Sequence, residues 1–211
     1  MPFIRTIENE VGIIGIWELL ETPDELESIF NFSDSEKIEY QQIKFDRRKK
    51  EFLSTRLLTK ILVGRKAEIE YLPSRKPLLR NEPQYISISH SENLVAVFLS
   101  PKCRIGIDAE RMDRNISQVA KRFLSISETE DIERLNDQQM GKILYWCGKE
   151  SIFKCTLQSK ILFNQHISIA PFLLNEEGTF LGSLHSNSDS ENFKLNYFRY
   201  KNNIVVYCVP L

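Results

Sequence analysis

The sequence predicts an α+β fold, in which short strands and capped helices follow one another in mixed order. Three short segments with strand patterns lie near the middle of the chain, at residues 85–89, 94–99 and 103–109. Near the end of the sequence, two more apolar segments flank the pair Asn202 and Asn203, which is typical of a β-hairpin turn, at residues 193–200 and 204–209. We therefore expect small sheets with tight turns that pack against helices.

The amino-terminal part predicts one buried strand and two helices. Residues 11–17 form an apolar run, and Thr22 stands where a helix N-cap is expected. Ser33 and Glu36 have the spacing of a capping box. A longer helix is expected to follow, because apolar residues recur at helical spacing until Gly64, a residue suited to end it.

The middle of the chain predicts a loop and two further helices. Residues 73–83 contain three prolines and are expected to form a loop. Ser127 and Glu130 have the spacing of a second capping box. Residues 138–157 are strongly apolar with helical spacing, which predicts a largely buried helix.

Length and composition favour one globular unit or two small fused subdomains. The chain has 211 residues, of which 42% are hydrophobic, enough for a sizeable core. Pro101 marks either a subdomain boundary or an ordinary turn between two strands of one sheet. In the first case we expect an amino-terminal subdomain at 1–101 and a carboxy-terminal subdomain at 102–211 that carries a metal site.

Charge and hydropathy exclude several function classes. The formal net charge of -1 gives no general attraction to nucleic acid or to anionic membranes. The start of the sequence, MPFIRTIENE, lacks a signal-peptide pattern, and no segment reaches the roughly 20 apolar residues that span a bilayer, so we expect a cytoplasmic protein. The four cysteines are widely spaced and are expected to be core residues rather than disulfides or zinc ligands.

Two carboxylates in the segment RIGIDAE are the first candidate site residues. Asp108 and Glu110 are two positions apart, so a strand sends both side chains to the same face. At roughly 7 Å and an effective dielectric near 20, two such anions repel by about 2 kcal/mol, which calls for a nearby cation. A solvated strand end with Arg111 or Arg114 as the counter-charge is the alternative explanation.

The segment WCGKESIFK supplies a third carboxylate. Glu150 and Lys154 interrupt an apolar stripe of the expected helix, formed by Ile143, Trp146, Cys147 and Leu157. Charged residues are seldom buried unless they are paired or bind a metal, so both side chains need partners. A buried ion pair between Glu150 and Lys154 is one explanation. A single divalent-metal site shared by Asp108, Glu110 and Glu150 is the other, and oxygen ligands favour Mg²⁺ or Mn²⁺.

Several stretches together resemble the 4′-phosphopantetheinyl transferase superfamily, in particular the surfactin-synthetase-activating type. The resemblance spans about residues 45–170, and the pairing of IGIDAE with WCGKESIFK is its most specific part. The other matching stretches are RRKKEFLSTRLLTKIL at 47–62, RKP at 75–77, ISISHSEN at 86–93 and KRFLSISE at 121–128. Arg75 stands where the family usually has glycine. The resemblance implies two similar subdomains in a pseudo-twofold arrangement, each a small, mainly antiparallel sheet packed with helices.

The resemblance also implies an activity and a set of residue roles. The expected reaction transfers the 4′-phosphopantetheine group from coenzyme A to a serine hydroxyl of an apo acyl or peptidyl carrier protein and releases 3′,5′-ADP. Asp108, Glu110 and Glu150 are expected to hold Mg²⁺ or Mn²⁺ in a cleft between the subdomains, with Glu150 also the base and Lys154 the partner of the leaving group. The residues expected to bind coenzyme A are Arg56, Lys76, Ser89, His90, Asp108 and Lys154.

The sequence leaves alternative functions and the identity of the partner open. One is a non-catalytic coenzyme A or nucleotide-binding regulatory module, and another is a glycoside hydrolase with two carboxylates. The carrier partner belongs to fatty-acid, polyketide or peptide synthesis, and we expect a monomer. His166 and His185 are expected to be structural.

Overall fold

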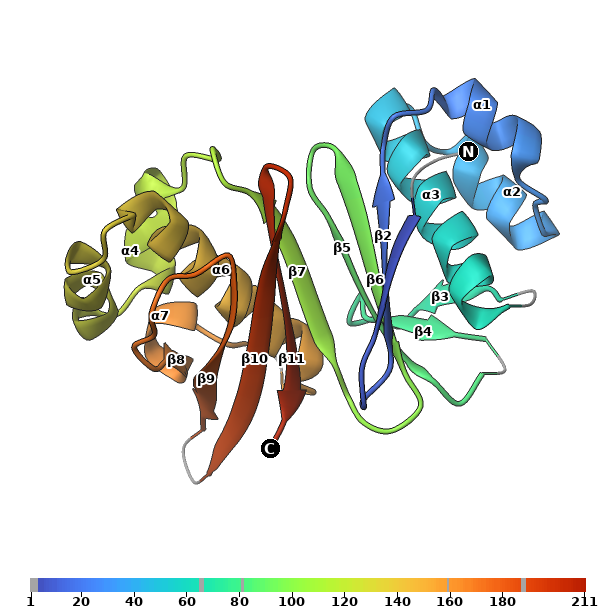
Figure 1. Ribbon diagram of the computed structural model, residues 1–211. Helices are drawn as coiled ribbons and strands as arrows, with labels where there is room; N and C mark the ends of the chain where they lie inside the picture. The colour runs from blue at the N-terminus through green and yellow to red at the C-terminus, as the bar shows by residue number, and fades with distance from the viewer. Residues whose placement is uncertain (1–3, 65–66, 81, 159, 187–188) are drawn as a thin grey trace.

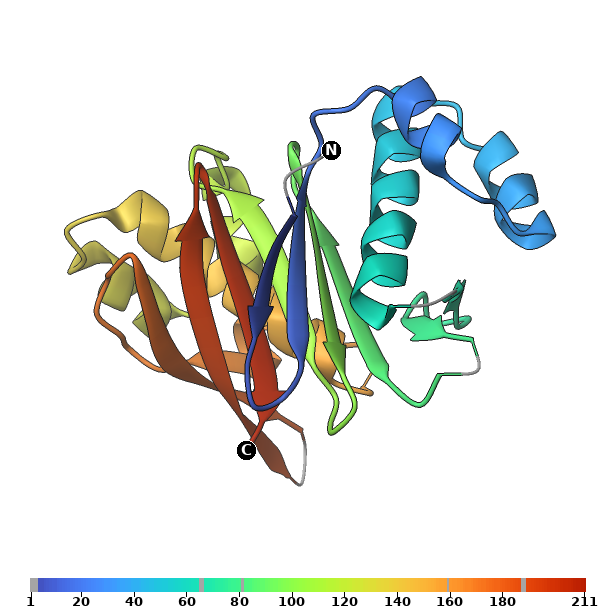
Figure 2. The ribbon, with the colours of Figure 1, turned by 45° about the vertical axis from the view of Figure 1, so that its right-hand side comes forward.

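The computed structural model describes residues 4–64, 67–80, 82–158, 160–186 and 189–211, which leaves the first three residues of the amino-terminal segment outside the description. Two antiparallel sheets lie side by side in the centre, and the helices cover their outer faces (Figure 1). Figure 2 shows the same layers from another side, with the long helix α3 standing along the outer face of one sheet. The α+β prediction is confirmed, while the pseudo-twofold relationship and the boundary at residues 101 and 102 stay predictions.

The amino-terminal sheet has four strands in the order β1-β2-β6-β5. Its strands are β1 (Ile4–Glu8), β2 (Ile13–Glu18), β5 (Tyr85–His90) and β6 (Leu94–Ser100). The associated helices are α1 (Pro23–Ile29), α2 (Asp34–Gln41) and α3 (Asp46–Val63). Leu53 and Leu58 of α3 and Val95 and Val97 of β6 are buried in one core cluster, so α3 seals the outer face of this sheet.

The carboxy-terminal sheet has five strands in the order β7-β11-β10-β9-β8. Its strands are β7 (Gly106–Arg111), β8 (Ile167–Ile169), β9 (Glu177–His185), β10 (Ser190–Tyr200) and β11 (Asn203–Pro210). The associated helices are η1 (Ser117–Val119), α4 (Ala120–Phe123), α5 (Ile126–Glu133), α6 (Gln138–Cys155) and α7 (Phe163–His166). Ile143 and Ile152 of α6 pack in one core cluster with Leu195 and Val206, which fixes this helix on the sheet.

A third core lies between the two sheets. Ile14 and Phe98 from the amino-terminal sheet share this core with Ile107, Ala109 and Val205 from the carboxy-terminal sheet. Because side chains alternate along β7, Ile107 and Ala109 point into this inner core and leave Asp108 and Glu110 on the face that α6 covers. The inner core therefore decides which face of β7 carries the carboxylates.

Several sequence predictions of helices are confirmed. Thr22 caps α1, and Ser33 and Glu36 form the capping box of α2. Gly64 ends α3 in the left-handed conformation at φ 73°. The strand expected at 11–17 is β2, and the expected hairpin is β10 and β11, joined by the turn at Lys201 and Asn202.

Two helix predictions are wrong in position. The long helix after Ser33 is divided, because the chain turns between Gln42 and Phe45 and α2 packs back on α3 through side-chain contacts that periodicity does not encode. The second capping box is formed by Ser125 and Glu128 rather than by Ser127 and Glu130. Both pairs have the required spacing, and the burial of Glu128 selects the first.

Other boundaries also differ. The helix expected at 138–157 ends at Cys155, so Leu157 lies beyond it and is 77% exposed. The segment expected to be a loop at 73–83 contains β4 (Pro77–Leu79), which pairs with β3 (Ile69–Tyr71). Strand β7 begins at Gly106 rather than at residue 103. Among the described residues, no helix is long and apolar enough to cross a membrane.

Candidate active site

Strand β7 and helix α6 form the floor of the candidate site. They pack closely because residue 106 is glycine: a Cβ atom there would lie 1.9 Å from the carbonyl oxygen of Ser151 on α6. Any larger residue would push the helix away from the strand. This close approach places Lys154 of α6 beside Asp108 of β7. The two segments therefore lie together, while the functional roles expected for these residues stay predictions.

Asp108 lies at the centre of the contacts. Its Oδ1 atom accepts hydrogen bonds from Ser89 Oγ at 2.8 Å and from Lys154 Nζ at 2.7 Å. The buried Cys147 thiol also hydrogen-bonds to Asp108, and its pKa is raised chiefly by burial and then by the Asp108 charge. Lys154 Nζ donates a further hydrogen bond to the carbonyl oxygen of Ile107 at 2.9 Å. Asp108 and Lys154 are thus a fixed ion pair between strand and helix.

Serine side chains of β5 connect the two sheets at this point. Ser87 Oγ accepts a hydrogen bond from Ile107 N at 3.0 Å, and Ser89 Oγ accepts one from Ala109 N at 3.1 Å. The single proton of the Ser89 hydroxyl is donated to Asp108, so in this arrangement Ser89 supports Asp108 and has no proton left for a phosphate. Its expected role in coenzyme A binding stays a prediction that requires this bond to be exchanged.

Glu150 faces Asp108 from α6 without a direct partner. Among the described residues, the Glu150 side chain makes no hydrogen bond and no ion pair, so the alternative of an ion pair with Lys154 is not observed. Burial and the Asp108 charge raise the pKa of Glu150 to about 7, and the more distant charges of Lys154 and Arg114 oppose that rise. A carboxylate held beside another carboxylate in this way is suited to receive a cation.

Glu110 is neutralised within the protein. Its Oε2 atom forms an ion pair with Arg114, and its Oε1 atom accepts a hydrogen bond from Arg111 N at 3.0 Å. The alternative counter-charge considered from the sequence is therefore present for Glu110. In the part of the chain that the structure describes, no group of three or more His, Cys, Asp or Glu side chains is arranged as a metal-ligand cluster. The predicted metal site requires side-chain movement.

A buried ion pair behind the site was missed by the sequence reasoning. Lys149, next to Glu150, is fully buried, and its Nζ atom lies 2.6 Å from Glu128 Oε2. It also donates hydrogen bonds to the carbonyl oxygens of Phe123 at 2.7 Å and Ile167 at 2.7 Å. The signal that could have identified Lys149 is the one that identifies Glu150 and Lys154, a charged residue within a strongly apolar helix.

His90 lies where two pockets meet. It ends β5 and lines a pocket of about 490 Å³ with Arg48, Arg56 and Tyr71, and a second pocket of about 520 Å³ with Arg47, Arg111 and Arg114. Although its side chain is exposed to these pockets, desolvation lowers the pKa of His90 to about 4, so the imidazole is neutral at pH 7. A neutral imidazole still donates one hydrogen bond to a ligand.

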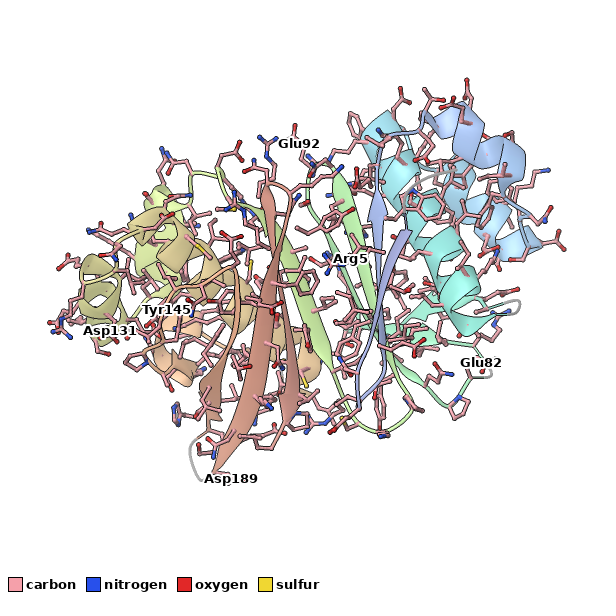
Figure 3. All side chains as sticks on the ribbon, viewed as in Figure 1. Arg5, Glu82, Glu92, Asp131, Tyr145 and Asp189 are labelled. Atoms are coloured by element: carbon pink, nitrogen blue, oxygen red, sulfur yellow. The ribbon has the colours of Figure 1, made fainter. Side chains whose placement is uncertain are left out.

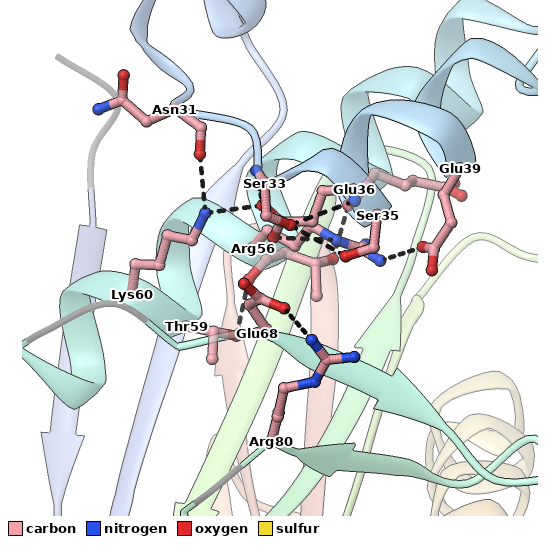
Figure 4. A network of polar contacts seen from close by, with 12 residues as sticks. Asn31, Ser33, Ser35, Glu36, Glu39, Arg56, Thr59, Lys60, Glu68 and Arg80 are labelled. Carbon is pink, nitrogen blue, oxygen red and sulfur yellow. Dashed lines mark hydrogen bonds and ion pairs between the residues drawn. The ribbon is translucent and has the colours of Figure 1, made fainter.

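The first pocket has a basic and aromatic lining. Arg56 is buried, and its guanidinium carbon lies 3.4 Å from the centre of the Phe52 ring. Its Nη2 atom binds Glu39 Oε2 at 2.7 Å, and its Nε atom lies 3.6 Å from Glu36 Oε1. Figure 4 shows these contacts between α2 and α3. Arg56 therefore lines the pocket, but its charge is already engaged by two glutamates, and its role in coenzyme A binding stays a prediction.

The basic run at the start of α3 also reaches the site. Arg47 and Arg48 line the two pockets beside His90. Both arginines form ion pairs with Glu51, which is buried beneath them. Their position follows from the packing of α3 against β2 and β6, which no local motif specifies.

Lys76 lies apart from these pockets. Its Nζ atom is 3.5 Å from the carbonyl oxygen of Lys154, at the end of α6, and burial lowers its pKa. The preceding Arg75 has φ 64°, a left-handed conformation that glycine adopts more easily. A glycine at position 75 would adopt this conformation without that cost.

Comparisons with known proteins agree with this arrangement. The sequence model of the 4′-phosphopantetheinyl transferase superfamily matches residues 104–208. Slr0495 of Synechocystis sp., provisionally named a 4′-phosphopantetheinyl transferase, is 31% identical over 123 residues, which cover 51% of this chain and 50% of that protein. HetI of Nostoc sp., named 4′-phosphopantetheinyl transferase, is 38% identical over 74 residues, or 33% of this chain and 31% of that protein. The chain thus matches half the length or less of these relatives. Residues 104–208, which contain Asp108, Glu110, Glu150 and Lys154, thus match the 4′-phosphopantetheinyl transferase superfamily.

Proposed function

We propose that the chain transfers the 4′-phosphopantetheine group from coenzyme A to a serine hydroxyl of an apo acyl or peptidyl carrier protein, with release of 3′,5′-ADP. The observation that carries this proposal is the contact between Lys154 and Asp108, with Glu150 beside them and without a partner of its own among the described residues. Asp108 and Lys154 are thereby held next to Glu150, a carboxylate whose pKa is raised.

The two pockets that meet at His90 support an extended anionic ligand. Their arginines offer positive charge at several points, and Phe45, Phe52 and Tyr71 provide an apolar surface in the first pocket. A nucleotide end in the first pocket and phosphates near His90 fit this distribution of charge. Arg56 would then exchange its contact with Glu39 for a contact with the 3′-phosphate of coenzyme A.

The carboxylates fit a divalent cation by their chemistry. Asp108, Glu110 and Glu150 offer only oxygen ligands, and Glu150 is a desolvated acid without a direct partner in the described chain. Mg²⁺ or Mn²⁺ held there would neutralise charge on the pyrophosphate of coenzyme A. Lys154 would stabilise the leaving phosphate oxygen, and Glu150 would accept the proton of the serine hydroxyl.

The mass of a carrier protein tests the proposal. The protein is incubated with coenzyme A, Mg²⁺ and several apo carriers, and each carrier should gain one phosphopantetheine. Glu150→Gln should abolish the gain without unfolding the protein, whereas Glu177→Gln, at an exposed acid on β9, should leave it unchanged. Binding of coenzyme A with no mass gain on any carrier would favour a non-catalytic binding module instead.

A further inference from the structure

The carboxylates of the site are partly neutralised by two internal cations. Lys154 contacts Asp108, and Arg114 contacts Glu110. The charge of Arg114 also reaches Glu150, where it opposes the rise in pKa. A divalent ion that binds Glu110 through Oε2 therefore competes with Arg114 for that oxygen.

The two cations differ in how firmly they are held. The Lys154 side chain is 26% exposed and donates to the Ile107 carbonyl oxygen as well as to Asp108. The Arg114 side chain is 50% exposed, and Glu110 is the one hydrogen-bonding or ion-pairing partner of its guanidinium among the described residues. Because the arginine half of this pair is exposed to water and has no second hydrogen-bonding or ion-pairing contact among the described residues, Arg114 is the easier one to displace.

The surroundings of Arg114 allow its side chain to move while its backbone stays in place. The Arg114 carbonyl oxygen accepts a hydrogen bond from Gln139 Nε2 of α6 at 2.8 Å. Its guanidinium carbon lies 5.9 Å from the Trp146 ring centre, and the residue lines the same pocket as Arg111 and His90. A released guanidinium thus has an aromatic face and an open pocket beside it.

We propose that Arg114 is an exchangeable counter-ion, which occupies Glu110 in the metal-free protein and yields it when a divalent cation binds. Arg114 thereby lowers the affinity of the free protein for the metal and adjusts the site to bind metal and phosphates together. This inference rests on the metal site of the proposed function. It assigns to Arg114 a positioning role and no contact with the reacting atoms.

Binding of Mn²⁺ to the free protein, without coenzyme A or carrier, tests this role by calorimetry or by electron paramagnetic resonance. Arg114→Gln should bind Mn²⁺ about fivefold more tightly than the unchanged protein, because one exposed ion pair no longer competes. Arg111→Gln is the matched control, since Arg111 lines the same pocket and has the same charge but pairs with Glu92 and Asp113. It should change Mn²⁺ affinity much less.

A second substitution locates the effect at Glu110. In a Glu110→Gln background, Arg114→Gln should give no gain in Mn²⁺ affinity, and thermal melting should show that each variant is folded. Equal gains for Arg114→Gln and Arg111→Gln would overturn the proposal, because the effect would then be one of general charge. No gain for Arg114→Gln, or no Mn²⁺ binding by any variant, would also overturn it. The carrier assay is independent, so phosphopantetheine transfer by the unchanged protein would separate this failure from failure of the proposed function.

Discussion

Lys149 on α6 and Glu128 on α5 form an ion pair of 2.6 Å whose side chains are 0% and 3% exposed. The pair joins α6 to α5, and Lys149 further binds the backbone between α7 and β8 through the Ile167 carbonyl oxygen. Glu128 Oε1 accepts a hydrogen bond from Ile169 N at 3.0 Å. Because Lys149 precedes Glu150, this pair also fixes the rotation of α6 that directs Glu150 toward Asp108.

Removal of one partner from this pair should strongly destabilise the fold. We expect Lys149→Met to lower the free energy of unfolding by about 3–5 kcal/mol, because Glu128 is left as an uncompensated buried charge. Urea denaturation measures the change. The double variant Lys149→Met with Glu128→Gln should lose less than the sum of the single variants, and strict additivity would contradict a direct pair.

Gly106 should tolerate no side chain. Gly106→Ala places a Cβ atom 1.9 Å from the Ser151 carbonyl oxygen, so α6 must shift away from β7. We expect a loss of about 3 kcal/mol or more in the free energy of unfolding, together with loss of transfer activity. Gly64→Ala is the comparison, since it meets no atom within 4 Å and has only its φ of 73° to strain it. That variant should lose about 1–2 kcal/mol and keep its activity.

His90 should affect ligand binding more than the chemical step. It lines both pockets but makes no contact with the proposed metal ligands in the described hydrogen bonds. We expect His90→Ala to raise the KM for coenzyme A about tenfold, because one hydrogen bond to a charged group is lost. The kcat should change little. His185→Ala is the control, because His185 lies on β9 and hydrogen-bonds to Ser168. Equal calorimetric affinities of the His90 variant and the unchanged protein would refute this role.

A carboxylate between the two sheets should make stability depend on pH. Glu18 of β2 binds Tyr200 and Lys201 of the β10–β11 hairpin. Arg5, labelled in Figure 3, lies near the same place, with its guanidinium carbon 5.9 Å from the Tyr200 ring centre. Burial opposes ionisation of Glu18, but the hydrogen bonds from Lys201 and Tyr200 outweigh it and hold its pKa below the usual value.

The sign of this dependence follows from the lowered pKa. The native state binds the Glu18 proton less tightly than the unfolded chain, so its contribution to stability is present above the unfolded pKa. It is lost as the pH falls through the lower folded pKa. We expect Glu18→Gln to be less stable than the unchanged protein at pH 7, and we expect this difference to shrink as the pH falls below the unfolded pKa, as measured by urea denaturation. A difference that stays constant over this range would contradict a role for the ionised carboxylate.

The sequence by itself determined the elements and the chemical character of the site. Alternation in β7 placed Asp108 and Glu110 on one face, and capping residues such as Thr22 and Ser33 located helix starts, because these signals act between residues near in sequence. The pairing of β7 with α6 also followed from recognisable motifs. Local patterns were insufficient where two equivalent signals competed, as with Ser125 and Ser127.

Only the tertiary structure decided which charges meet. Ser89 supports Asp108 across the two sheets, Arg114 neutralises Glu110, and Arg56 is held by Glu36 and Glu39 of another helix. Each contact depends on how sheets and helices pack, and no sequence periodicity predicts which charged residues form an ion pair. Packing of β7 against α6 therefore brought Asp108 into contact with Lys154, and the distribution of neighbouring cations left Glu150 without a direct partner among the described residues.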